Sequence, residues 1–156
     1  MVISVDYRLA PEHKFPIPVE DSQAALAWLR DNASDLGLDL SRIAIGGDSA
    51  GANISAAITH LDRGNATPLA AQVLLFPATE YAIYRPSWME NANAPLLTTA
   101  DTIWFWGQYL RTEADRTDRP DRARYPFDPR RRRMSVVVGD GGGVSEFCHG
   151  LSRSEE

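Results

Sequence analysis

Cysteine, long apolar runs and internal repeats are the features that this sequence lacks or has least of. It contains 1 cysteine, Cys148, which excludes an intramolecular disulfide and provides no spacing typical of a metal site. A single thiol suits a reducing compartment, so we expect a cytoplasmic protein. No apolar run approaches the roughly 20 residues of a membrane span, and no basic stretch followed by an apolar one opens the chain. We therefore expect neither a membrane span nor a signal peptide, and no repeat architecture.

The composition and the charge pattern divide the chain near residue 111. Of the 156 residues, 44% are hydrophobic, which is enough to form a core in one folded domain. The net charge is -5, yet residues 111–133 hold 9 arginines against 5 acidic side chains. We therefore predict a folded domain over residues 1–110, followed by an atypical arginine- and glycine-rich segment over residues 111–156.

Short β-rich runs alternate with helical patterns in the first domain. The predicted strands lie at residues 2–7, 42–45 and 71–76, and the predicted helices lie at residues 19–33, 50–61 and 98–110. Two glycines are expected to break the second strand after residue 45. Alternating strands and helices with short links predict an α/β fold with a mostly parallel sheet.

Two further segments have patterns of their own. Residues 80–97 look irregular, and residues 134–138 are one more candidate strand. The helix at residues 98–110 contains three adjacent aromatic side chains, Trp104 to Trp106, which cover more than one helix face. We therefore expect this helix to be buried or to lie under a cap.

The pentapeptide GDSAG at residues 47–51 is the motif that carries chemistry. It has the form G-x-S-x-G and lies between a predicted strand and a predicted helix. A serine at such a turn has a strained conformation and an exposed Oγ, so Ser49 is the candidate nucleophile, and the N–H of Ala50 is the expected oxyanion donor. Glycines at both ends would let neighbouring backbone approach. The alternative interpretation is an ordinary tight turn; a phosphate-binding loop is disfavoured because the loop contains no lysine.

Several motifs in the same order resemble one family. These motifs are VDYRLAPE at residues 5–12, RIAIGGDSAG at residues 42–51 followed by Asn53, QVLLFP at residues 72–77, and the WFW helix. Together they are similar to the hormone-sensitive-lipase-like esterases, the fold-3 group of α/β hydrolases. The resemblance covers about residues 2–110. It implies a carboxylic-ester hydrolase that acts on short-chain esters through an acyl-enzyme, without a metal or an organic cofactor.

The same resemblance shows where the sequence departs from the family. The family has an HGGG-type loop before the VDYRLAPE segment, which supplies further oxyanion donors, whereas this chain opens at that segment. We therefore expect a partial α/β-hydrolase fold that lacks the N-terminal strands and the usual C-terminal part.

The triad's acid and histidine should follow the serine. The chain has 3 histidines. His13 precedes the motif, and His60 is about 16 Å from Ser49 along the predicted helix. His149 followed by Gly150 resembles the histidine-glycine end of the family, and this resemblance makes His149 the candidate base. Asp128 and Asp140 are candidate acids, but Asp128 follows no strand and Asp140 is too close to His149 for a helix and a strand between them.

The end of the family match suggests a second hypothesis. The match stops abruptly, and a run of arginines at residues 130–133 and a triple glycine follow. A reading-frame shift in a GC-rich gene would produce this composition after about residues 111–125. Translating the encoding DNA in the other frames tests the hypothesis.

Two classes other than an active esterase stay open. The chain could be a non-catalytic remnant or an association module that binds further copies through exposed sheet edges. The arginines at residues 130–133 could contact nucleic acid, but the chain is acidic overall and has no recognised nucleic-acid fold, so we expect no nucleic-acid partner.

Overall fold

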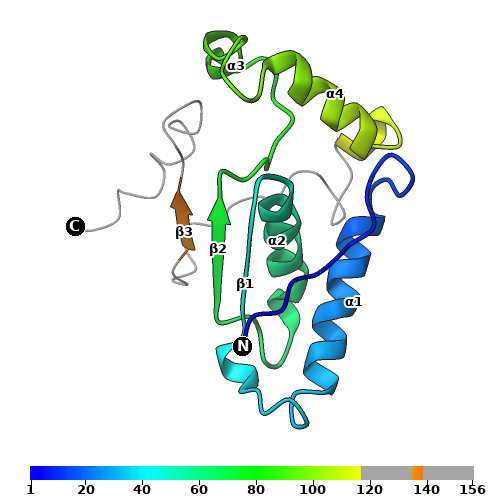
Figure 1. Ribbon diagram of the computed structural model, residues 1–156, viewed down its shortest axis with the longest axis vertical. Coiled ribbons are helices and arrows are strands. Elements are labelled where there is room, and N and C mark those ends of the chain that lie inside the picture. Colours follow the sequence, from blue (N-terminus) through cyan, green and yellow to red (C-terminus); the bar gives the residue numbers. More distant parts are fainter. Residues whose placement is uncertain (117–134, 139–156) are drawn as a thin grey trace, which may run out of the picture.

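A computed structural model describes residues 1–116 and the backbone of residues 135–138. The elements are α1 (Ile17–Asp31), β1 (Ala44–Asp48), α2 (Ser49–Leu61), β2 (Ala71–Leu75), α3 (Pro86–Glu90), α4 (Thr99–Tyr109) and β3 (Ser135–Val138). Short 3-10 turns lie at Leu40–Arg42, Asp62–Gly64 and Glu113–Arg116. The strands and helices alternate along the chain, as the sequence pattern predicts (Figure 1).

The strands form one parallel sheet in the order β1-β2-β3. They lie side by side and point in the same direction (Figure 1). Asp48 pairs with Leu75, and Leu75 pairs with Val138, so the strands reach their carboxyl ends at one common edge. The predicted α/β class with a parallel sheet is confirmed, and so is the strand predicted at residues 134–138.

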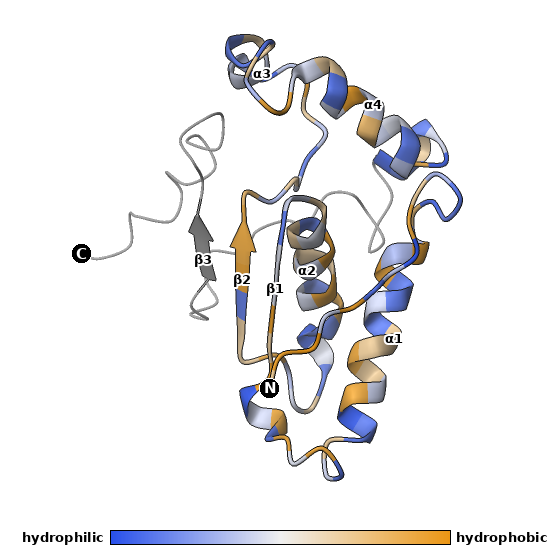
Figure 2. Cartoon of the chain, viewed as in Figure 1, coloured by the Kyte–Doolittle hydropathy of each residue, from blue (hydrophilic) through white to orange (hydrophobic). Residues whose placement is uncertain are grey.

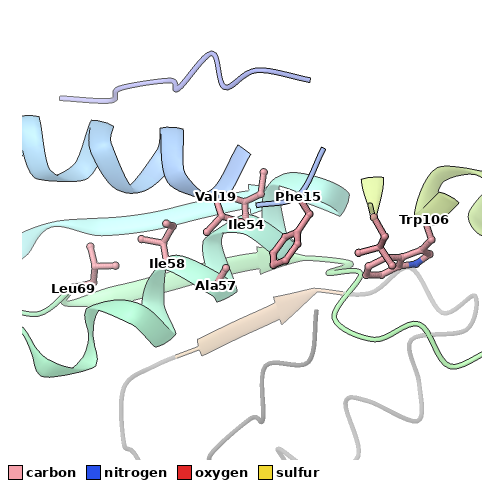
Figure 3. Close-up of a cluster of buried hydrophobic side chains, with 8 residues drawn as sticks. Phe15, Val19, Ile54, Ala57, Ile58, Leu69 and Trp106 are labelled. Carbon is pink, nitrogen blue, oxygen red and sulfur yellow. The ribbon is translucent and has the colours of Figure 1, made fainter. Parts of the chain in front are cut away.

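The hydrophobic core centres on helix α2. Helix α2 packs on β1 and β2, and α1 packs on α2. Figure 2 shows hydrophobic residues along most of β2 and hydrophilic residues on several turns of α1. The buried cluster comprises Phe15, Val19, Ile54, Ala57, Ile58, Leu69, Trp106 and Leu110. In Figure 3 this cluster extends from Leu69, past Ile58 and Ile54, to Trp106 of α4. One core therefore connects both long helices with α4.

A buried ion pair joins the end of α1 to the end of α2. The guanidinium of Arg30 donates to both carboxylate oxygens of Asp62, at 2.6 and 2.9 Å. Asp62 also accepts a hydrogen bond from the Leu69 backbone N–H at 2.8 Å, and Arg30 donates to the Thr67 carbonyl. Burial opposes the charge of Asp62, but these hydrogen bonds outweigh it and lower the pKa of the carboxyl. The pair fixes the chain between α2 and β2.

The strand predicted at residues 2–7 is wrong. These residues form no strand, and Val2 is 96% exposed. A strand is stabilised by main-chain hydrogen bonds to a neighbour, and the segment pairs with none of the strands in the described part of the chain. Its β-branched composition alone could not predict the pairing.

The expected break at the two glycines is also wrong. Gly46 and Gly47 lie inside β1, where they pair with Val73 and Leu74. A Cβ at Gly46 would lie 3.0 Å from the Val73 carbonyl oxygen, so the close approach of β2 suits a residue without a side chain. The glycines therefore continue the strand and allow its neighbour to approach closely.

The region after β2 differs from its prediction in two respects. The stretch predicted as irregular contains the short helix α3. Helix α4 starts at a capping box, in which Thr98 and Asp101 exchange hydrogen bonds, and Trp106 is buried. Trp104 and Phe105, however, are 59% and 56% exposed, so the first alternative, a buried helix, is wrong for these two residues, and a cap over the helix stays a prediction. Among the described residues, only the Trp106 side of the helix has a core to pack against.

Candidate active site

Ser49 lies at the junction of β1 and α2 in an unusual backbone conformation. β1 ends at Asp48 and α2 begins at Ser49, with no loop between them. The φ of Ser49 is 47°, in the left-handed region that non-glycine residues rarely adopt. Such a residue costs about 1–3 kcal/mol and persists only where the surrounding structure determines it. The residue is exposed, so the strained turn presents the hydroxyl to solvent.

The glycines of the motif have different roles. A Cβ on Gly47 would lie 2.5 Å from the carbonyl carbon of Gly51 and 2.6 Å from its oxygen. Only glycine fits there, because the first turn of α2 packs directly on the strand end. A Cβ on Gly51 would meet no atom within 4 Å among the described residues. The expected close approach is therefore present at residue 47 and not at residue 51.

The N-terminus of α2 provides donors beside Ser49. Asp48 precedes the helix in an extended conformation and makes no side-chain capping hydrogen bond. The first amides of a helix have no intrahelical acceptor, and the helix dipole favours negative charge at this end. Ala50 is the second residue of α2, so its N–H belongs to this set. The geometry suits an oxyanion forming next to the Ser49 hydroxyl.

Helix α2 also fixes the segment that leaves β2. The buried Asn53 donates a hydrogen bond through Nδ2 to the Ala78 carbonyl, at 2.6 Å. Phe76, which lies between the end of β2 and Ala78, has a φ of 37°. It is a second strained position at the carboxyl edge of the sheet. Sequence reasoning noted Asn53 only through the resemblance and missed Phe76, because a phenylalanine gives no signal for a positive φ. The proline that follows it was the one sign of a strand end.

The segment before α1 is held by an ion pair. Arg8 donates to Asp21 from its backbone N–H at 3.0 Å, from Nε at 2.9 Å and from Nη2 at 2.6 Å. These hydrogen bonds lower the pKa of Asp21 to about 2. The VDYRLAPE segment is therefore connected to the first turns of α1. His13, directly after this segment, is exposed in the proline-rich turn, as the sequence indicates.

The helix that begins at Ser49 carries a histidine, but at its other end. His60 lies in the last turn of α2, at the opposite end of the helix from Ser49. At 1.5 Å per residue the two are about 16 Å apart along the axis, so His60 is not the base. The candidate base His149 and the candidate acids Asp128 and Asp140 lie outside the described residues. Their roles stay predictions.

Neither a metal-binding cluster nor a membrane-spanning helix is present in the described part of the chain. Three or more His, Cys, Asp or Glu side chains are nowhere grouped there as a metal would need. Of the helices at residues 1–116, none is long and apolar enough to cross a membrane.

Comparison with known proteins decides the family. A family model described as the α/β-hydrolase fold (Abhydrolase_3) matches residues 1–140. The chain belongs to this α/β-hydrolase family. The match extends beyond residue 110, where the sequence pattern placed the division between two segments. The position of that division stays a prediction.

The curated relatives of this α/β hydrolase include esterases. It is 53% identical over 98 residues to a carboxylesterase of Mycobacterium tuberculosis named NlhH, which corresponds to 62% of this chain and 31% of the relative. It is 46% identical over 117 residues to a carboxylic ester hydrolase of the same organism named LipN, which corresponds to 70% of this chain and 31% of the relative. The chain therefore spans about a third of the length of these relatives.

Solved structures of esterases share the fold. The carboxylesterase EstE1, cloned from a metagenomic library, superposes with a TM-score of 0.67 at 42% identity, over 72% of this chain and 40% of that one. The esterase of Pyrobaculum calidifontis superposes with a TM-score of 0.79 at 33% identity, over 94% of this chain and 50% of that one. The resemblance to hormone-sensitive-lipase-like carboxylesterases and the partial α/β-hydrolase fold are confirmed.

Proposed function

We propose that this protein is a carboxylic-ester hydrolase that forms an acyl-enzyme at Ser49. The observation that carries the proposal is the turn itself. Ser49 has a φ of 47° between a parallel strand and a helix, and crowding at Gly47 fixes that turn. An ordinary tight turn gives no reason to place an exposed serine in this strained position. The carboxylesterases among the relatives support the same reaction.

The mechanism follows from the positions of these groups. The Ser49 Oγ attacks the ester carbonyl while a histidine takes the hydroxyl proton, and the carbonyl oxygen becomes an oxyanion. The Ala50 N–H and the N-terminus of α2 stabilise that oxyanion. The intermediate then expels the alcohol, which takes the proton from the histidine, and leaves an ester of Ser49. Water, deprotonated by the same histidine, attacks this ester and releases the acid.

The base, the acid and the further oxyanion donors are also part of the proposal. His149 is the candidate for the base, and a carboxylate that orients it is still to be identified. Further oxyanion donors belong to an HGGG-type loop in the family, and one donor contributes on the order of a hundredfold or more to the rate. Short-chain esters are the proposed substrates, without a metal or an organic cofactor. The proposed location is the cytoplasm, which rests on the single cysteine.

Hydrolysis of p-nitrophenyl butyrate by the purified full chain tests the proposal. The matched variants are Ser49→Ala and Ser34→Ala, because Ser34 is an exposed serine outside the motif. We expect the wild type and Ser34→Ala to hydrolyse the ester, and the Ser49→Ala rate to fall to the level without enzyme. Equal rates in the wild type and Ser49→Ala would refute the proposal.

Exposed apolar residues favour a second candidate, self-association without catalysis. Val2 and Leu96 are 96% and 105% exposed, and Val73 on β2 is 43% exposed. Where such groups form one contiguous patch, that patch marks an association surface. Sedimentation equilibrium tests this candidate: a stable oligomer without esterase activity would favour it, and an active monomer would exclude it.

A further inference from the structure

Two neighbouring strands end in the same way. Asp48 of β1 pairs with Leu75 of β2, and the residue after each has a positive φ: 47° for Ser49 and 37° for Phe76. Paired strands are about 4.8 Å apart, so Ser49 and Phe76 leave the sheet from adjacent positions at one edge. In Figure 1 the chain from β2 continues beyond this edge toward α3 and α4.

Phe76 is an unusual residue for this position. A positive φ is a genuine outlier for a bulky side chain, and such strain is concentrated at ligand and active sites. Burial of the ring would offset its cost, but the residue is 43% exposed and is not part of the buried core. Packing in the described part of the chain therefore does not account for an aromatic ring here.

Helix α2 holds the segment after β2 in place. Asn53 is one turn after Ser49 on α2 and is 6% exposed, and its Nδ2 donates to the Ala78 carbonyl at 2.6 Å. Pro77, between Phe76 and Ala78, restricts the backbone further. Helix α2 therefore both carries Ser49 and holds the chain two residues after Phe76.

We propose that Phe76 forms a wall of the acyl-binding site and limits the length of the acyl chain, with Asn53 as its positioning residue. This inference rests on the proposed function, because it places the acyl group of an ester on Ser49. A rigid ring next to the acylated oxygen leaves room for a short chain and excludes a long one. Removing the ring opens that space, and releasing the Ala78 carbonyl lets the ring move away.

The test is the chain-length profile of kcat/KM for p-nitrophenyl esters from acetate to decanoate. We compare the wild type with Phe76→Ala and Phe76→Gly, both of which remove the ring, whereas only glycine also relieves the positive φ. The ratio of octanoate to butyrate should rise at least about tenfold in both variants. Phe76→Gly should have a higher Tm than Phe76→Ala. Asn53→Leu, which keeps the shape but cannot donate, should shift the profile in the same direction.

A binding measurement separates this inference from the proposed function. Straight-chain methyl ketones imitate the ester but cannot be hydrolysed, and ligand-observed NMR measures their affinity without turnover. If neither the wild type nor any variant hydrolyses esters, the proposed function fails, yet Phe76→Ala should still increase the preference for the longer ketones. A chain-length profile in Phe76→Ala that matches the wild type, in kcat/KM or in ketone affinity, would overturn the role of Phe76.

Discussion

Two glycines of one motif should respond to alanine with opposite signs. In Gly47→Ala the new Cβ would lie 2.5 Å from the Gly51 carbonyl carbon, whereas carbon atoms in contact lie about 3.5–4.0 Å apart. One group must therefore move by about 1 Å. The atoms that it meets are backbone atoms of α2, which cannot rotate away as a side chain can. Overpacking costs about 1–3 kcal/mol and occasionally more, so we expect a loss of about 3 kcal/mol in the free energy of unfolding.

Gly51→Ala is the matched control. Its Cβ would meet no described atom within 4 Å, and alanine is favoured over glycine in a helix by about 1 kcal/mol. We therefore expect Gly51→Ala to be more stable than the wild type by about 0.5–1 kcal/mol. The displaced turn in Gly47→Ala should also reduce ester hydrolysis more than Gly51→Ala does.

Urea unfolding followed by circular dichroism measures both effects. The midpoints should move in opposite directions at an unchanged m value. Equal shifts of the same sign in the two variants would mean that the strand end and the first turn of α2 are not in contact, which would refute the geometry described for the Ser49 turn.

Three further predictions concern the fold that supports the turn. Arg30→Met leaves the buried carboxylate of Asp62 without its charged partner, so urea unfolding should show a loss of about 3–5 kcal/mol; a loss below about 1 kcal/mol would contradict the buried pair. Asp21 has a folded pKa of about 2, below its ordinary 3.8, so its stabilising contribution is present above pH 4 and lost as the pH falls to 2. Asp21→Asn should therefore flatten the pH dependence of Tm in that window, and an unchanged curve would count against the ion pair. Ile58→Ala should destabilise by about 2–5 kcal/mol because the side chain is 1% exposed, whereas Trp104→Ala, at 59% exposed, should cost far less; similar losses would place the core elsewhere.

The elements next to Ser49 were predictable because their signals are local. Helical periodicity after residue 50 and the apolar run at residues 71–76 each depend on a few adjacent residues, and both agree with the structure. The GDSAG pattern predicted a strand-to-helix turn, and φ at Ser49 agrees with the strain expected there. A local sequence pattern was therefore sufficient to predict those elements whose conformation depends mainly on their own residues.

The errors share a physical cause, which is dependence on distant parts of the chain. Residues 2–7 have strand composition, but a strand also needs a partner, which local pattern cannot supply. Gly46 continues β1 because it pairs with Val73, which approaches it closely. This pairing depends on the neighbouring strand and not on the residues next to Gly46. Trp104 is exposed because packing, not hydrophobicity, determines which face of α4 is buried. The segment after the strained Phe76 is held at Ala78 by Asn53, which is on another element.

The most direct test of the central claim is a search for the covalent bond to Ser49. The full chain is incubated with a fluorophosphonate ester, which reacts with activated serines, and is then digested and mapped by mass spectrometry. We predict that the peptide containing residues 47–51 gains the mass of the phosphonyl group, and that Ser49→Ala gains none. A chain that remains unlabelled, or that is labelled equally in the Ser49→Ala variant, would contradict the claim that Ser49 is an activated nucleophile.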